Sequence, residues 1–164
     1  MKTDGVKNKN SPLRISGVLQ KLRHYCIYQE RNHYEVIQKL WDLGVPAAQH
    51  DEIIATLIEE DYLNEERFAM EFTGGKFRMN KWGKRKIAHA LRRKQVSKYC
   101  IDKAMKSIDT EEYNRTAKRI AEDKYASLKS EQYLVRKKKT IDYLIQKGYE
   151  PELAADIVNR LVKY

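Results

Sequence analysis

The sequence is poor in the residues that form loops and cross-links: its 164 residues include only 7 glycines, 3 prolines and 2 cysteines. So few glycines and prolines argue against long loops. Cys26 and Cys100 are too few for a disulfide framework and too far apart for a CxxC site, so we expect reduced thiols. No run approaches the ~18 apolar residues of a membrane span, and residues 1–12 lack the apolar core of a signal peptide. A cytoplasmic protein is therefore expected.

The residues that are abundant favour helices. Hydrophobic residues make up 41% of the sequence and charged residues 34%, with Leu, Ile, Ala, Lys, Arg and Glu prominent. Alternation of apolar and polar residues, which is typical of strands, is scarce. This composition predicts an all-α protein.

Charge is distributed unevenly along the chain, whose formal net charge is +10. Residues 51–72 contain 8 acidic residues and 1 basic residue, whereas residues 73–108 contain 12 basic residues and 1 acidic residue. An excess of basic residues spread evenly along the chain would mainly increase solubility. An excess concentrated in one segment instead indicates a binding face for a polyanion or an acidic surface.

A repeat is visible in three stretches that begin at Val36, Ile87 and Thr140 and align without internal gaps. The positions that match in all three are a helix end (Gly44, Gln95 and Gly148) and four apolar positions (Leu40, Leu91 and Leu144; Ile53, Ala104 and Ile157; Ile54, Met105 and Val158; Leu57, Ile108 and Leu161). A period near fifty residues indicates tandem copies of one helical unit.

Each unit is predicted to contain three helices. We expect helices at about 14–30, 33–43 and 47–60, then 64–79, 83–95 and 97–108, then 111–128, 131–147 and 151–163. Asn32 and Glu35 have the spacing of a capping box at the second of these helices. Gln95 stands where the other repeats have glycine, so a less regular helix end is expected there.

The expected architecture is three tandem three-helix repeats, stacked into an elongated, curved array of one monomer. Its predicted parts are a flexible N-terminal tail at 1–12, repeat 1 at 13–61, a basic repeat 2 at 62–109 and repeat 3 at 110–164. A single unit of about 50 residues would bury too little surface to be secure alone.

The acidic stretch "EEDYLNEERFAMEF", residues 59–72, lies at the junction of the first two repeats. Asn64 can cap the next helix, and the acidic residues that follow it suit a helix N-terminus. Phe68, Ala69 and Phe72 share one face and should point inward. The acidic residues just before the junction, at 51–61, are left without a structural explanation.

The same junction resembles a protein family. "YLNEERFA" at 62–69 is similar to the Tyr-Leu-Asp-Asp-Glu-Arg-Phe-Ala hallmark of the RecX proteins, and "KFRMNKWGKRKI" at 76–87 is similar to their basic stretch. The resemblance covers roughly residues 14–164. The departures are Asn64 for aspartate, Gln95 for glycine, His50 at an aliphatic position, and Gly74-Gly75 inside a helix that could bend or fray there.

The resemblance implies a non-enzymatic regulator of the recombinase RecA. Proteins of this family bind RecA, lie along the groove of the RecA–DNA filament, and restrain its growth, ATPase, strand exchange and role in LexA self-cleavage. No cofactor is implied. The expected partners are RecA and its nucleoprotein filament, with modest direct affinity for DNA.

The basic segment is the candidate binding site. The residues expected to contact the filament or DNA are Lys76, Arg78, Lys81, Lys84, Arg85, Lys86, Arg92 and Arg93. On the helix at 83–95, Ile87 and Leu91 should face inward and the cations outward. The alternative for these cations is a solvated face. Trp82 could stack on a base or, as we expect, act as a packing anchor.

No catalytic or metal-binding constellation stands out in the sequence. The four histidines are expected to be ordinary surface or boundary residues, and no glycine-rich phosphate loop is present. Two functions from other classes remain open beside RecA regulation. A stand-alone DNA- or RNA-binding module would bind nucleic acid tightly without RecA and with steep salt dependence. A generic helical scaffold would neither bind nucleic acid tightly nor affect RecA.

Overall fold

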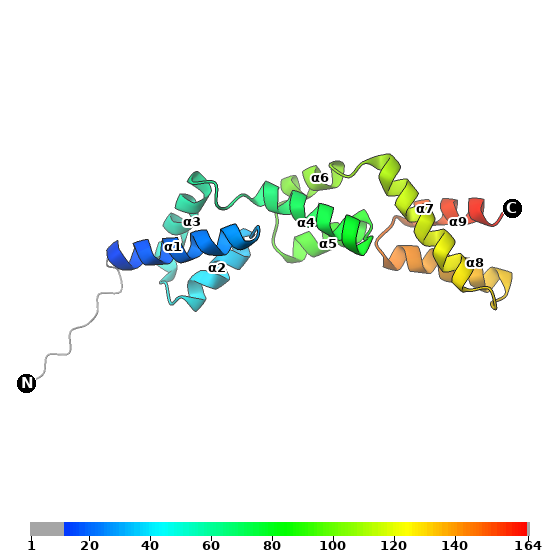
Figure 1. Cartoon of the computed structure of the whole chain (residues 1–164), viewed down its shortest axis with the longest axis horizontal. Helices are drawn as coiled ribbons and strands as arrows, with labels where there is room; N and C mark the ends of the chain where they lie inside the picture. The colour runs from blue at the N-terminus through cyan, green and yellow to red at the C-terminus, as the bar shows by residue number, and fades with distance from the viewer. Residues whose placement is uncertain (1–11, 164) are drawn as a thin grey trace, which may run out of the picture. The chain divides into compact units, whose positions relative to one another are not determined.

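The computed structural model describes residues 12–163, and over these residues it is entirely helical (Figure 1). Its elements are α1 (Pro12–Tyr28), α2 (His33–Asp42), the 3-10 helix η1 (Ala47–Gln49), α3 (His50–Glu59), α4 (Glu65–Asn80), α5 (Lys84–Arg93), α6 (Lys98–Lys106), α7 (Thr110–Ser127), α8 (Tyr133–Gln146) and α9 (Pro151–Leu161). The predicted all-α fold is confirmed. The predicted flexible tail at 1–12 lies outside the described residues, except for Pro12, where α1 begins.

The helices follow one another in three trios, and the chain divides into two compact units. The boundary between the units falls inside α4, between Phe68 and Ala69. The first unit holds α1–α3 and the start of α4, and the second holds the remainder. The predicted repeat boundaries and the curved stacking of the repeats stay predictions.

The core of the first unit is formed by one face of each of its three helices. Its buried residues are Val18, Leu22 and Cys26 of α1, Val36 and Leu40 of α2, Ile53 and Leu57 of α3, and Val45 and Leu63 of the connections. Burial of this kind stabilises the fold by about 1.5–3 kcal/mol for each large apolar side chain. Burial also raises the pKa of the Cys26 thiol to about 11, which keeps it protonated at neutral pH.

Two polar residues in the first unit are also buried. Asn32 forms the predicted capping box: its side chain accepts a hydrogen bond from the Glu35 N–H at 2.7 Å, and the Glu35 carboxylate accepts one from the Asn32 N–H at 2.9 Å. His50 is only 6% exposed, so the expectation of a surface or boundary residue is wrong for it. Its Nε2 lies 2.8 Å from the Val45 carbonyl oxygen, and its ring packs edge-on against Trp41. These partners satisfy a polar side chain at an aliphatic position.

The helix ends that define the repeat share one geometry. Gly44, Gln95 and Gly148 all have positive φ, at 67°, 59° and 99°. In each repeat the N–H of the following residue donates to the carbonyl of a buried leucine at 3.0–3.1 Å. The pairs are Val45 and Leu40, Val96 and Leu91, and Tyr149 and Leu144. This is a Schellman motif in all three repeats. The prediction of a less regular end at Gln95 is therefore wrong, because Gln95 adopts the left-handed conformation that glycine adopts elsewhere.

Helix α4 continues through Gly74 and Gly75 without interruption, so the fraying considered for this pair does not occur. The Arg78 side chain lies over Gly74, where an added Cβ would come within 2.8 Å of the guanidinium Nη1. Nothing lies within 4 Å of the corresponding position at Gly75. Only the first of the two glycines is thus in close contact with another side chain.

An aromatic chain crosses the core of the second unit. Its members are Phe77 of α4, Tyr113 of α7 and Tyr149 of the α8–α9 connection. The ring centroids of Phe77 and Tyr113 are 5.9 Å apart, and those of Tyr113 and Tyr149 are 5.1 Å apart. All three residues are buried. Ile87 and Leu91 of α5, Leu144 of α8 and Val158 of α9 are also buried, at 0% exposure. The aromatic chain therefore joins residues of the second and third repeats in one buried contact.

Candidate functional site

Helix α5 carries most of the candidate cations, and its two faces differ sharply. Ile87 and Leu91 are fully buried, whereas Arg85, His89, Arg92 and Arg93 are exposed. This is the orientation that the spacing predicts, because residues three and four positions apart share a face. Of the remaining candidates, Arg78 and Lys81 are exposed and Lys76, Lys84 and Lys86 are half-buried.

The eight candidate cations form no ion pair with any acidic side chain within residues 12–163. The second basic run, residues 136–139, behaves differently. Arg136 donates to the Tyr125 carbonyl at 2.6 Å and stacks on the ring of that tyrosine, while Lys138 pairs with Asp142 at 2.6 Å and Lys139 with Glu131 at 2.5 Å. The charge of α5 is therefore uncompensated within the described residues, whereas two of the four cations at 136–139 are paired with carboxylates.

Trp82 lies between two of these cations. The Lys76 and Lys86 ammonium groups are 4.9 and 4.6 Å from its ring centroid, within cation–π range. The ring is half-buried. Because two ammonium groups already lie against it, this geometry favours the packing interpretation of Trp82 over base stacking.

The start of α5 is held by the third repeat through the backbone. The Gly83 N–H donates to the Lys147 carbonyl at 2.8 Å, and the Arg85 N–H donates to the Gly148 carbonyl at 3.0 Å. The two glycines are so close that a Cβ on Gly83 would lie 2.3 Å from the carbonyl carbon of Gly148. These contacts use amides that a helix N-terminus would otherwise leave unpaired.

Tyr113 strengthens the same junction from α7. Its hydroxyl accepts a hydrogen bond from the Lys84 N–H at 2.9 Å and donates one to the Glu150 Oε2 at 2.8 Å. The Lys84 ammonium lies 4.9 Å from its ring centroid. Burial and the neighbouring Glu150 raise the pKa of Tyr113, and burial likewise raises the pKa of Tyr149, whose hydroxyl donates to the Lys81 carbonyl at 2.9 Å. Both hydroxyls therefore remain protonated at neutral pH.

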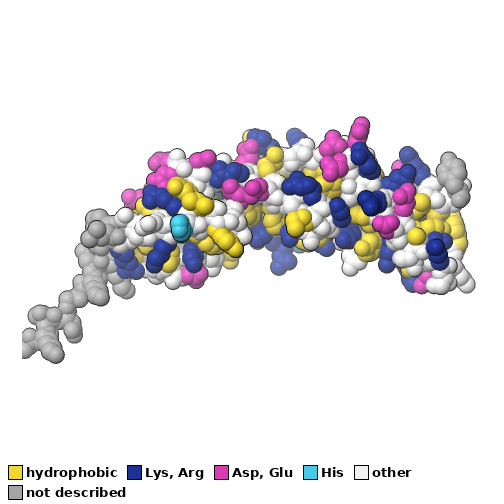
Figure 2. Space-filling model, viewed as in Figure 1, with side chains coloured by type: hydrophobic (Ala, Val, Ile, Leu, Met, Phe, Trp, Pro, Cys, Tyr) yellow, Lys and Arg dark blue, Asp and Glu magenta, His cyan; other side chains and the backbone are white. Residues whose placement is uncertain are grey.

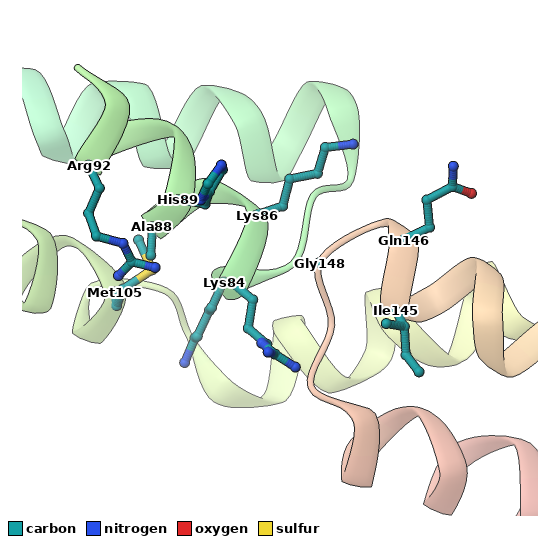
Figure 3. A pocket seen from close by; sticks show the side chains of 10 residues that line it. Lys84, Lys86, Ala88, His89, Arg92, Met105, Ile145, Gln146 and Gly148 are labelled. Atoms are coloured by element: carbon teal, nitrogen blue, oxygen red, sulfur yellow. The ribbon is translucent and has the colours of Figure 1, made fainter.

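A hollow of about 560 Å³ opens beside this junction, and we call it the basic hollow (Figure 3). It is lined by Lys84, Arg85, Lys86, Ala88, His89 and Arg92 of α5, Met105 of α6, and Ile145, Gln146 and Gly148 at the end of α8. In Figure 3 the Arg92 side chain reaches down beside Met105, while the Lys86 side chain extends toward the opposite side of α5. The lining of the hollow thus combines several cations with three apolar side chains, Ala88, Met105 and Ile145, which we call its apolar floor.

Half of the candidate residues meet at the basic hollow and half do not. Lys84, Arg85, Lys86 and Arg92 line it. Lys76 lies against Trp82, Arg78 covers Gly74, and Lys81 donates to the Arg78 carbonyl at 2.8 Å and lines a separate pocket with Lys124 and Tyr143. Arg93 is exposed outside the hollow.

Sequence reasoning missed the third-repeat residues that position the hollow, chiefly Tyr113, Gly148 and Tyr149. The sequence identifies Gly148 only as a helix end and singles out neither tyrosine. Their proximity to the start of α5 depends on tertiary contacts between residues 29 to 68 positions apart, namely the Tyr113–Lys84 and Tyr149–Lys81 hydrogen bonds. Only the positive-φ glycine at the α8–α9 connection could have indicated a close approach.

The acidic junction between the first two repeats is mainly structural. The Asn64 side chain accepts a hydrogen bond from the Arg67 N–H at 2.9 Å, which confirms the predicted cap. Arg67 in turn pairs with Glu30 and, at 3.0 Å, with Asp61. Glu60 forms a bidentate pair with Arg23, both contacts at 2.7 Å, and this pairing lowers the pKa of Glu60.

The remaining acidic residues of the strip at 51–61 lie on the surface. Asp51 and Glu52 are in the first turn of α3, where the helix dipole favours them. On the face drawn in Figure 2, acidic side chains gather over α3. The role of this exposed part of the strip is not explained by ion pairs.

The described residues hold no group of three or more His, Cys, Asp or Glu side chains placed to bind a metal ion. Neither Cys26 nor Cys100 forms a disulfide, and both are buried. No helix in the described part of the chain is long and apolar enough to cross a membrane.

Comparison with known proteins identifies the family. Residues 64–105 match the family model described as "RecX, second three-helix domain", and residues 111–158 match "RecX, third three-helix domain". The chain is 33% identical over 159 residues to the regulatory protein RecX of Clostridium perfringens strain 13, covering 95% of this chain and 69% of that protein. It is 30% identical over 146 residues to the regulatory protein RecX of Lactobacillus johnsonii, covering 89% of this chain and 54% of that protein.

The chain thus spans between about half and two thirds of the length of these curated relatives. Among solved structures, a crystal structure of RecX from Lactobacillus salivarius matches with a TM-score of 0.85 and 22% identity, over 92% of this chain and 98% of that chain. This likeness supports the helical fold. The hallmark at 62–69, the three-helix domain matches and the relatives agree, and the chain belongs to the RecX family.

Proposed function

We propose that this chain is a non-enzymatic regulator of RecA. It binds RecA and the RecA–DNA filament and inhibits or modulates the recombinase, ATPase and LexA-coprotease activities of that filament. Membership of the RecX family supports this proposal, as does the name "Regulatory protein RecX" carried by its relatives. Action on RecA would place the protein in the cytoplasm, where we expect it to work as a monomer.

The observation that carries the proposal at the level of residues is the unpaired charge of α5. Arg85, Arg92 and Arg93 are exposed and have no acidic partner within residues 12–163. A RecA–DNA filament offers DNA phosphates and acidic protein side chains, and guanidinium groups on a fixed helix suit both. The exposed acids of α3 would then face basic protein surface or repel misplaced DNA.

The experiment that tests the function is a titration of this protein into RecA during DNA-dependent ATP hydrolysis. We expect the ATPase rate to change in a saturable manner, because a protein bound along the filament alters the state that hydrolyses ATP. An unchanged rate, together with unchanged LexA cleavage, at concentrations well above that of RecA would contradict the proposal.

A stand-alone nucleic-acid-binding module is the second candidate, and the basic hollow is the observation that favours it. That function predicts tight DNA or RNA binding without RecA, with a steep loss of affinity as salt rises. The regulatory function predicts only modest affinity for DNA alone and a large effect when RecA is present. Measuring both under one salt condition separates the two.

A further inference from the structure

The basic hollow has the chemistry of a site for one nucleotide unit. We propose that it binds a nucleoside phosphate, with the phosphate groups held by Lys84, Arg85 and Arg92 and the sugar or base resting on the apolar floor. This inference rests on the proposed function and deepens it, because it assigns the hollow to the nucleic-acid component of the filament and not to RecA side chains.

The charge of the hollow points to a phosphate. Lys84, Arg85 and Arg92 all line it, and none of them pairs with a carboxylate within the described residues. Arg85 and Arg92 are seven residues apart, so they share one face of α5 and their Cα atoms are separated by about 10 Å along the axis. A single protein carboxylate would leave most of this charge uncompensated, whereas the two phosphates that flank one nucleotide of a strand, or the phosphate chain of a free nucleotide, can approach both ends of the row.

The floor of the hollow points to an organic group beside the phosphate. Ala88, Met105 and Ile145 line it, and Ile145 is 38% exposed although it is apolar. Its volume of about 560 Å³ lies within the ~300–1,000 Å³ typical of small-molecule sites. Inorganic phosphate or a carboxylate would leave this apolar surface in water, and a sugar or base would cover it.

The walls of the hollow are fixed before any ligand arrives. The backbone of Arg85 is hydrogen-bonded to Gly148, and the backbone of Lys84 to Tyr113, so both cations start from positions tied to the third repeat. Preorganisation of this kind reduces the entropy lost on binding. Since these two amides already have partners, the side chains and not the helix N-terminus would supply the phosphate contacts.

The test is direct binding of a fluorescently labelled single-stranded oligothymidylate to the full chain in the absence of RecA, measured by anisotropy across a range of salt. The site variants are Arg92→Gln and Lys84→Gln. The matched control is Lys118→Gln, which removes an exposed lysine of α7 that lies 3.8 Å from Glu122 and outside the hollow.

Each site variant should weaken binding about tenfold, the loss expected for one charge-assisted contact. It should also reduce the slope of log K against log salt by about 0.7, the value for one phosphate contact on a single strand. The control should change neither quantity. Site variants that bind like the parent, or that lose affinity with an unchanged salt slope, would overturn the assignment.

Competition distinguishes the sources of the ligand. ATP that displaces the oligonucleotide shows that the hollow accepts a free nucleotide, and ATP that fails to displace it shows that a strand is required. A polyglutamate peptide that competes as well as unlabelled oligonucleotide would contradict the proposal, because the site would then recognise only negative charge. If the site variants still inhibit RecA, the assignment of the hollow is wrong and the proposed function stands. If the parent binds the oligonucleotide but has no effect on RecA, the proposed function is wrong and the assignment of the hollow stands.

Discussion

Gln95 shows how a single residue can carry strain that its repeat equivalents avoid. Its φ of 59° is the conformation that Gly44 and Gly148 adopt without a Cβ. The hydrogen bonds around it are nevertheless the same, with the Val96 N–H donating to the Leu91 carbonyl at 3.1 Å. The fold of the repeat therefore imposes the conformation on a residue that disfavours it.

Gln95→Gly should raise the free energy of unfolding by about 1 kcal/mol, because glycine avoids the cost of the left-handed conformation. Urea unfolding followed by circular dichroism measures the change. Gln95→Ala is the control, since alanine retains the strain and should give no gain. Equal stability of the glycine and alanine variants would show that the positive φ carries no penalty here.

Tyr113→Phe should destabilise the second unit by about 1–3 kcal/mol, because the Lys84 N–H and the Glu150 carboxylate both lose a buried partner. It should also change the response to alkaline pH. The pKa of Tyr113 is raised in the folded state, so its contribution is complete below about pH 10 and is lost as the pH rises further.

Urea unfolding at several pH values between about 8 and 11 tests both expectations for Tyr113. The parent should lose stability as the pH passes 10, and the Tyr113→Phe variant should lose less. Tyr133→Phe is the control, because Tyr133 is 53% exposed. Parallel curves for the parent and the Tyr113 variant would contradict the raised pKa.

At the scale of the helix, the sequence contained enough information to place most elements. The predicted helix at 83–95 corresponds to α5, and the one at 151–163 to α9, because both combine a clear apolar face with a recognisable start. The predicted helix at 47–60 is less regular, since its first residues form the 3-10 helix η1. The cationic face of α5 followed from spacing alone, but the basic hollow did not, because α8 supplies part of it.

Leu91→Ala and Phe68→Ala should both destabilise the fold by about 2–5 kcal/mol, since the two side chains are 0% and 5% exposed in apolar surroundings. Thermal unfolding should report a lower midpoint for each variant, with loss of RecA inhibition in parallel. Leu134→Ala is the control, because Leu134 is 73% exposed on α8. Native stability of Leu91→Ala would mean that α5 does not pack as described.

At the scale of the second unit, the contact between Gly83 and Gly148 joins the basic helix to the third repeat. Gly148 has a φ of 99°, and a Cβ added to it would lie 2.3 Å from the Lys86 Cβ. Neither glycine could be assigned this role from the sequence, because the approach of two backbones leaves no pattern in either repeat. A rigid junction here would keep the cations of α5 in a fixed relation to α8 and α9.

Gly148→Ala should therefore destabilise the second unit by about 1–3 kcal/mol or more, through backbone strain and overpacking. Gly75→Ala is the matched control: nothing lies within 4 Å of its added Cβ, and alanine should stabilise α4 by up to about 1 kcal/mol. Chemical denaturation of both variants gives the comparison. A Gly148→Ala variant as stable as the parent would show that the junction is loose.

For the molecule as a whole, we expect the uncompensated cations of α5 to act on the RecA–DNA filament. The most direct test is the DNA-dependent ATPase of RecA in the presence of a triple variant, Arg85→Glu, Arg92→Glu and Arg93→Glu. The control triple variant reverses Arg119, Lys129 and Lys163, which are exposed elsewhere in the second unit. Both variants should keep the helicity and stability of the parent, and both change the net charge equally.

We expect the α5 variant to lose most of its effect on the ATPase, because three favourable contacts become repulsive, and the control variant to act like the parent. A folded α5 variant that inhibits RecA as strongly as the parent would show that these cations do not bind the filament and that this helix is a solvated face.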